Sequence, residues 1–306
     1  MQQKSDFARH GLGIGLYLAG VGFFALNDAL GKWLVGNNYT VAQLLFVRAI
    51  GAVAILVPIM LRLRITFRVQ GDWRLHAARL LLQTLDSYCF YLSTWYLPLV
   101  DVMTFYMSGP IILTAISGLV LRERVGPYRW SAVVIGFMGV VIALAPGSEQ
   151  SVSNNETLGA LIALLGAAAF AISLAMTRRL RDNHPMPLVL SQFVVGGVVG
   201  AALCPFAWTP PSVIDFGWML ILGVGAAGCF LLITRALALA PASLLAPFQY
   251  SAIFWAGLFG WIWWAHTPTP RIILGNAILI ASGLFVFYRE RRLAVTVSRD
   301  KVEQIP

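Results

Sequence analysis

Charged side chains are scarce in this sequence. Only 11% of its 306 residues are Asp, Glu, Lys or Arg, whereas 58% are hydrophobic. A typical soluble domain has about 25% charged residues and cannot hide so large an apolar fraction in its core. The composition therefore excludes an ordinary soluble protein and indicates an integral membrane protein.

Motifs for enzyme, metal or nucleotide chemistry are also missing. The four histidines are scattered without H-E-x-x-H spacing, and no G-x-x-x-x-G-K-S/T segment occurs. Cys89, Cys204 and Cys229 fall within apolar stretches, without the spacing of a metal site or a disulfide framework. We expect them to pack as small apolar residues. We therefore expect no cofactor and no metal, and an intramembrane enzyme is a weak alternative.

Ten apolar stretches are close to the ~20 residues that a membrane-spanning helix needs. Short connections rich in Pro, Gly and Asn separate them, which is typical of packed antiparallel helices. We predict an all-α integral membrane protein whose partners include the lipid bilayer. The ten predicted transmembrane helices cover residues 11–35, 40–61, 74–97, 99–121, 128–145, 157–179, 187–208, 214–239, 243–264 and 271–289.

The basic residues predict the orientation of these helices. The net charge is +9, but Lys and Arg flank the apolar stretches, so they indicate topology rather than a nucleic-acid partner. With the N-terminus in the cytoplasm, only Lys32 and Arg271 approach the opposite side. We expect a multi-pass protein of the inner membrane with both termini in the cytoplasm and the loop around 147–156 outside.

The two halves of the sequence align with each other. Residues 96–125 match residues 237–268 at a constant shift, which sets Pro98 on Pro241 and Ser108 on Ser251. Each half holds five predicted helices, and an odd number makes the second half enter the membrane from the opposite side. We predict two inverted repeats around a central cavity, at 10–147 and 156–292, followed by a cytoplasmic tail at 293–306.

The paired segments "SGPIILTAISGLVLRERV" (108–125) and "APFQYSAIFWAGLFGWIWW" (246–264) resemble the EamA type of the drug/metabolite transporter superfamily. "NDALGKWL" (27–34) is most similar to the branch that contains S-adenosylmethionine and riboflavin uptake carriers. The resemblance implies a central cavity lined by helices one to four and six to nine, with alternating access that needs no nucleotide hydrolysis. In one respect the sequence departs from the family, because His266 replaces the acidic residue usual at the end of the ninth helix.

Three charged residues lie within the first two predicted helices. A charge near the bilayer centre costs at least ~2.5–3.5 kcal/mol, so such residues normally face a partner or a watery cavity. Asp28 and Arg48 lie at similar depths, and Lys32 lies one turn beyond Asp28, so Asp28 is expected to pair with Arg48 or with Lys32. Either these residues clamp two helices together, or they line the cavity and exchange partners when substrate arrives.

The third predicted helix carries the clearest polar face. The residues at intervals of three, four or seven that share this face are Arg79, Gln83, Asp86, Ser87, Phe90 and Thr94. Asp86 lies near the midplane, where transporters with inverted repeats bind substrate. A carboxylate there suits a proton carrier or a counter-ion to a cationic substrate group, and a hydrogen bond to a neighbouring helix is the alternative.

Weaker candidates lie on the fourth and ninth predicted helices. Phe105, Ser108, Gln249 and Tyr250 are expected to contact substrate. Three charged residues are expected to act as a gate or clamp. They are Lys32, Asp101 and Glu123, the last of which is alternatively a solvated surface charge.

Together these features predict a secondary active transporter of a small organic metabolite, coupled to protons or working by exchange. An exporter of aromatic or other amino acids, or of drugs, with the same fold is the alternative. The sequence leaves open the substrate, the direction of transport, and the choice between a monomer and a homodimer.

Overall fold

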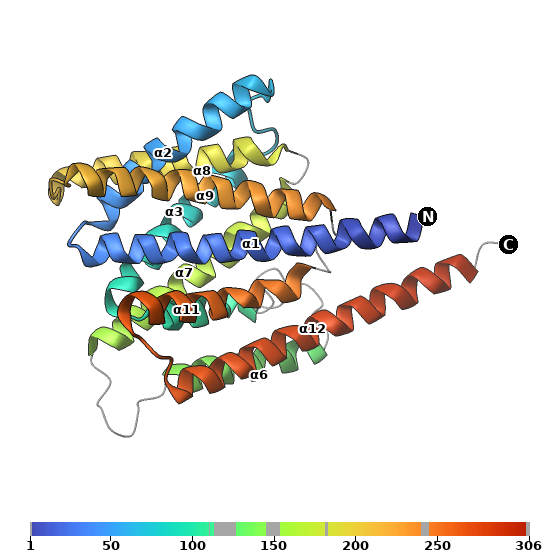
Figure 1. The fold of residues 1–306 in the computed structure, drawn as a ribbon. Helices are drawn as coiled ribbons and strands as arrows, with labels where there is room; N and C mark the ends of the chain where they lie inside the picture. The colour runs from blue at the N-terminus through green and yellow to red at the C-terminus, as the bar shows by residue number, and fades with distance from the viewer. Residues whose placement is uncertain are drawn as a thin grey trace.

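The computed structural model describes residues 2–109, 111–112, 127–144, 154–180, 183–239 and 245–303. Within these ranges every regular element is a helix. The long helices lie side by side in one bundle, and both chain termini lie at the same end of it (Figure 1). We call this the Gln70 end, after the loop between the second and third helices, and the opposite end the Asn37 end.

Both halves of the chain contribute helices that run between these two ends. The first half contributes α1 (Gln2–Gly36), α2 (Val41–Arg62), α3 (Trp73–Tyr96), α4 (Leu99–Tyr106) and α6 (Pro127–Leu144). The second half contributes α7 (Asn154–Arg179), α8 (Pro185–Leu203), η1 (Cys204–Phe206), α9 (Val213–Leu239), η2 (Ala246–Tyr250), α11 (Ser251–Trp264) and α12 (Pro270–Glu303).

Side chains at the helix starts explain where several of these elements begin. The side chain of Thr40 accepts a hydrogen bond from the Gln43 backbone N–H at the start of α2, and Asp72 does the same for Arg74 at the start of α3. Such caps satisfy donors that the first helical turn leaves without a partner. Pro185 opens α8, where a missing N–H has no consequence.

Five of the described helices are long and apolar enough to cross a membrane: Gly11–Gly36, Val41–Arg62, Asn155–Thr177, Pro185–Phe206 and Val213–Ala236. Helix α3 is as long, at 24 residues, but charged side chains such as Arg79 and Asp86 make it less apolar. Val133–Ala143 and Pro270–Phe285 are shorter apolar helices. The protein is therefore an all-helical membrane protein, and ten spans remain a prediction.

Two of the predicted continuous spans are interrupted. Instead of one helix from residue 99, α4 ends at Tyr106 and a turn follows at Met107 and Ser108. In the corresponding place of the second half, the 3-10 helix η2 precedes α11. The hydroxyl of Ser108 donates to the Phe105 carbonyl oxygen, and that of Ser251 donates to the Phe248 carbonyl oxygen at 2.6 Å. Such bonds compete with the helical ladder and favour a break.

The main packing contacts join one half of the chain to the other. Helix α1 packs on α9, α3 on α7, α2 on α8 and α9, and α6 on α12. Glycines allow α2 and α9 to cross closely, because a Cβ on Gly223 would collide with the carbonyl oxygen of Arg48, and one on Gly51 with that of Leu220. This close crossing fixes the backbone of α2 around Arg48.

Polar contacts join the two halves at both ends of the bundle. At the Asn37 end, the amide of Gln43 bonds the backbone of Thr209 twice, at 2.7 and 3.2 Å. At the Gln70 end, the amide of Asn183 bonds the backbone of Gln70 twice, at 2.7 and 2.9 Å. Each pair of hydrogen bonds satisfies the backbone N–H and C=O of one residue in the opposite half. We call these two contacts the Gln43 clasp and the Asn183 clasp.

Candidate functional site

Arg48 is the most unusual residue in the interior of the bundle. Helix α2 places its side chain against α3 and α8 with only 8% of its surface exposed. Its Nη1 donates to the hydroxyl of Tyr91 at 3.1 Å, and its guanidinium carbon lies 5.5 Å from the Tyr91 ring centre and 5.1 Å from that of Phe193. Its Nε is buried without a hydrogen-bond partner. A buried charge is therefore held by one hydroxyl and two aromatic rings.

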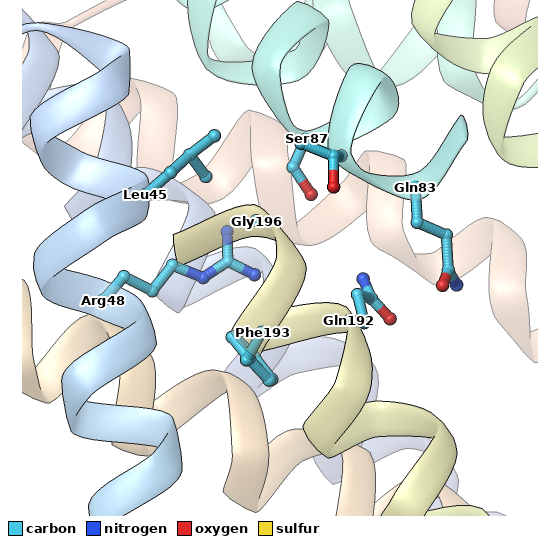
Figure 2. Close-up of a pocket in the computed structure, with 8 residues that line it drawn as sticks. Leu45, Arg48, Gln83, Ser87, Gln192, Phe193 and Gly196 are labelled. Atoms are coloured by element: carbon cyan, nitrogen blue, oxygen red, sulfur yellow. The ribbon is translucent and has the colours of Figure 1, made fainter. Parts of the chain in front are cut away.

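A small cavity of about 20 Å³ lies beside Arg48. Figure 2 shows the Arg48 guanidinium directed toward the space between α3 and α8, with Gln83, Ser87 and Gln192 around it. This volume holds about one water molecule. The other lining residues are Leu45, Thr84, Phe193 and Gly196.

Two carboxylates lie within electrostatic range of Arg48. Asp28 is buried on α1, and Asp86 is half-buried on α3. No ion pair joins Asp28 to Arg48 in the described part of the chain, so the predicted direct bridge is wrong for this conformation. The tyrosine hydroxyl of Tyr91 takes the position at Nη1 that a carboxylate would need. Arg48 and the two carboxylates form a cluster without direct contact.

Asp86 is incompletely paired. Its Oδ1 is buried without a partner, while the hydroxyl of Tyr106 donates to its backbone oxygen at 3.1 Å. Its neighbours on the predicted polar face, Gln83 and Ser87, line the Arg48 cavity, but Asp86 is not among the residues that do. Gln83 and Ser87 thus face the Arg48 cavity, whereas Asp86 lies outside its wall.

Two further members of the predicted face, Arg79 and Phe90, are buried. Arg79 has only 1% of its surface exposed and donates to the Gln83 side chain at 2.6 Å and to the Leu188 carbonyl oxygen of α8 at 2.9 Å. Phe90 packs edge-on against Tyr91 and Tyr106. These contacts orient the side chains that surround the cavity.

Lys32 lies apart from this cluster. Its Nζ donates to the Leu97 carbonyl oxygen at 2.5 Å and sits 5.4 Å from the ring centre of Trp264, so the alternative contact with Asp28 is not formed. Asp101 is within electrostatic range of both Lys32 and Arg271. The structure therefore brings together two of the predicted gate residues at the Asn37 end. The third, Glu123, lies outside the described residues.

The weaker candidates are not at the Arg48 cavity. Phe105 is buried in the hydrophobic core, and the hydroxyl of Ser108 donates to the Phe105 carbonyl oxygen of α4. The hydroxyl of Tyr250 lies against Gly283 of α12, and its neighbour Gln249 is on the same 3-10 helix. These positions were predicted because their side chains are aromatic or polar. In the structure none of them lines the Arg48 cavity.

Sequence reasoning missed the contributions of α8 and the role of Tyr91. Gln192 and Phe193 line the cavity, and Tyr91 is the partner of Arg48. Gln192 had a detectable signal, because with Ser191 it interrupts an otherwise apolar helix. Tyr91 and Phe193 had none, since a buried aromatic residue in an apolar helix is most often part of the core. Within the described ranges, no group of three or more His, Cys, Asp or Glu residues is placed to hold a metal ion.

Comparison with known proteins identifies the family of this chain. The EamA-like transporter family matches residues 11–145 and again residues 157–288. The riboflavin transporter of Rhizobium johnstonii is 28% identical over 90% of this chain and 91% of its own. The S-adenosylmethionine uptake transporter of Rickettsia bellii is 23% identical over 92% and 96%.

Two further matches agree with this result. The riboflavin transporter of Vibrio cholerae is 29% identical over 62% of each chain. One solved crystal structure has the same fold, with a TM-score of 0.61 and 15% identity over 94% of this chain and 98% of the matched chain. The resemblance expected from the paired segments is thereby confirmed. The chain belongs to the EamA-like transporter family, and it is a small-molecule transporter rather than an enzyme.

Proposed function

We propose that the protein takes up a small polar metabolite across the cytoplasmic membrane by alternating access, and that the Arg48 cavity is part of its binding site. The observation that carries this proposal is the cluster of Arg48, Asp28 and Asp86, three ionisable residues of which the first two are buried and the third is half-buried, and which make no ion pair with one another. Ionisable residues within a membrane mark pathways for substrates and ions.

Unpartnered polar atoms support a binding role for this cluster. The Arg48 Nε and the Asp86 Oδ1 are both buried without hydrogen bonds. Most buried polar atoms in folded proteins have a partner, and exceptions call for a specific explanation. A polar substrate or a transferred proton supplies the missing partner. Arg48 offers a planar donor for an acidic or carbonyl group of the substrate, and Asp86 an acceptor for a proton or an ammonium.

The size of the cavity supports a change of conformation during transport. About 20 Å³ has room for one water molecule and for no metabolite. Contacts of polar side chains join the two halves at both ends, through the Gln43 clasp and the contact of Lys32 with the Trp264 ring at one end, and through the Asn183 clasp and Arg79 at the other. Substrate entry therefore requires α2, α3 and α8 to separate at one end, while the other end stays closed.

Three features support two inverted repeats, which we propose to span residues 10–147 and 156–292, followed by a cytoplasmic tail. The same family matches both halves of the chain. In two such repeats α1 corresponds to α7 and α3 corresponds to α9. The contact of α1 with α9 therefore has its counterpart in the contact of α7 with α3, and both are present. The interrupted helices at Ser108 and Ser251 lie at aligned positions, and paired interruptions of this kind accompany midplane sites in transporters.

The names of the relatives suggest the first substrates to test, riboflavin and S-adenosylmethionine. Purified protein in liposomes is given each labelled compound, with and without the same unlabelled compound inside. We expect uptake of one of them to be accelerated by internal substrate, which is typical of a carrier rather than a channel. Arg48→Lys keeps the charge but removes the planar donor, and we expect it to weaken apparent affinity at least tenfold, or about 1.4 kcal/mol.

Arg74→Lys serves as the matched control because Arg74 lies exposed at the start of α3. Equal effects of the two substitutions would remove Arg48 from the binding site. A labelled aromatic amino acid tests the exporter alternative in the same liposomes. Exchange of that compound, without exchange of riboflavin or S-adenosylmethionine, would replace our proposal by the alternative.

A further inference from the structure

A groove of about 880 Å³ lies between α1, α9 and α11 and shares no lining residue with the Arg48 cavity. Its walls are almost entirely apolar, and three indole rings, from Trp33, Trp218 and Trp263, line it. Trp218 is 41% exposed and Trp263 is 49% exposed, so the groove opens on the surface of the bundle that faces lipid. Its volume lies within the range of about 300–1,000 Å³ found for small-molecule sites.

One polar side chain in this groove lacks a partner. Asn27 is only 7% exposed, and its Nδ2 is buried without a hydrogen bond. The side chain of Asn27 lies over Gly225, which also lines the groove and leaves room for the amide. Because buried side-chain donors are nearly always paired, this donor calls for a specific explanation, and a hydrogen-bond acceptor bound in the groove would supply one.

The positions of the indoles and of Asn27 define the shape of the occupant. Trp33 follows Asn27 by six residues, or about 9 Å along α1. Indole rings offer flat apolar faces that stack on flat partners. A planar compound of two or three fused rings spans this distance, so that one part of it packs against the indoles while an acceptor reaches the Asn27 amide.

A phospholipid tail fits these features less well. Asn27 precedes Gly36, the last residue of α1, by nine residues, or about 14 Å. The ester oxygens of a phospholipid lie at the edge of the hydrocarbon layer, which is about 30 Å thick, so only methylene groups would reach the depth of Asn27. An acyl chain in the groove would therefore leave the Asn27 donor unpaired.

We propose that the groove between α1, α9 and α11 is a second ligand site, which binds a planar aromatic compound with a ring acceptor that enters from the bilayer. This site is separate from the proposed transport site. It does not depend on which metabolite the Arg48 cavity accepts.

The test uses lumichrome, a planar tricyclic compound with ring carbonyl groups that absorbs where tryptophan emits. Full-length protein in liposomes is titrated with lumichrome, and quenching of tryptophan fluorescence reports binding. We expect saturable quenching. Gly228→Phe fills the groove without a collision, because a Cβ on Gly228 meets nothing within 4 Å, and we expect it to abolish the saturable component. Asn27→Leu removes the donor, and we expect about tenfold weaker binding.

The matched control is Gly217→Phe, since Gly217 is on the same helix with equally open space but does not line the groove. Gly217→Phe and Arg48→Lys are both expected to bind lumichrome as the unmodified protein does. Loss of binding in Arg48→Lys would assign the compound to the transport site and overturn the proposal. A parallel experiment with brominated phospholipid tests the acyl chain. Quenching of the unmodified protein but not of Gly228→Phe by that lipid would show that an acyl chain occupies the groove. Together with the absence of a saturable lumichrome signal, this result would also overturn the proposal.

Discussion

Arg48 is held in the interior of a membrane protein without a carboxylate in contact with it. The hydroxyl of Tyr91 accepts one of its hydrogen bonds, and the rings of Tyr91 and Phe193 lie against its planar group. Arginine suits this position better than lysine because its charge is spread over a plane that stacks on aromatic rings. The arrangement leaves the Nε buried without a hydrogen-bond partner.

Replacement of Tyr91 by phenylalanine tests this account. Tyr91→Phe removes the hydroxyl that accepts a hydrogen bond from Arg48 while keeping the ring, so a buried charged donor loses this acceptor. We expect the free energy of unfolding to fall by about 1–3 kcal/mol, measured by thermal unfolding in detergent micelles. Tyr88→Phe on the same helix is the control, because the Tyr88 hydroxyl has no hydrogen bond in the described part of the chain. Similar losses for the two variants would contradict the proposed role of Tyr91.

Asp86→Asn separates two roles for the incompletely paired carboxylate of Asp86 on α3. The substitution keeps the volume and the hydrogen bonding but makes the group permanently neutral. If Asp86 carries a coupling proton, exchange across liposomes continues while uptake driven by a pH gradient is lost. If Asp86 is a counter-ion to the substrate, binding weakens at every pH. Unchanged affinity, exchange and pH dependence would show that Asp86 has only a structural role.

At the scale of helices, close contact between α2 and α9 determines where Arg48 lies. Gly223→Ala places a methyl group against the Arg48 carbonyl oxygen and 2.8 Å from the Ala52 nitrogen. We expect a loss of about 1–3 kcal/mol in unfolding free energy, because backbone on both helices must move apart. Transport is expected to fall as well, since the displaced backbone carries Arg48.

Gly217→Ala is the control for this prediction, because its methyl group meets nothing within 4 Å. Alanine is favoured over glycine in a helix by up to ~1 kcal/mol, so Gly217→Ala is expected to be neutral or stabilising. Thermal unfolding of the two variants in the same detergent compares them directly. If Gly223→Ala were as stable as Gly217→Ala, the close crossing of the two helices would be wrong.

The helices themselves were the most predictable part of the fold. An apolar run such as 41–62 can satisfy its backbone in lipid only as a helix. The interruptions at Ser108 and η2 were not predictable by the same argument, because a hydropathy window averages over residues that remain apolar through the break. The serine hydroxyls that accompany the breaks are common inside transmembrane helices, so their presence alone predicts nothing.

The site was predictable only in part. Counting residues predicts how deep in the membrane a side chain lies, and the structure buries Arg48 and places Gln83 beside it in the wall of one cavity. The partner of each charge depends on how each helix is rotated and on which helix packs beside it. Those contacts join halves of the chain more than 100 residues apart, as Phe193 and Arg48 do. For this reason the sequence suggested an Asp28–Arg48 bridge, whereas the structure has Tyr91 and Phe193 around Arg48.

At the scale of the whole molecule, the two clasps lie at opposite ends of the same helix pair. The Gln43 clasp connects the start of α2 to the connection after α8, and the Asn183 clasp connects the loop before α8 to the one after α2. Helices α2 and α8 are therefore held together along their length, with the Arg48 cavity beside them. A transport cycle that opens one end at a time must release one clasp while the other is kept.

The proposed orientation places the Gln43 clasp outside the cell and the Asn183 clasp in the cytoplasm, because the Gln70 end carries most of the arginines. Single cysteines at Asn37 and Thr66 test this. Both positions are exposed, at opposite ends of the bundle, and the native Cys89, Cys204 and Cys229 are buried, so background labelling is expected to be low. In intact cells an impermeant maleimide is expected to label Asn37→Cys and to label Thr66→Cys only after the membrane is opened. Labelling of Thr66→Cys alone in intact cells would invert the topology. The Gln43 clasp would then lie in the cytoplasm and the Asn183 clasp outside the cell. The order in which the two clasps must be released for uptake would be reversed as well.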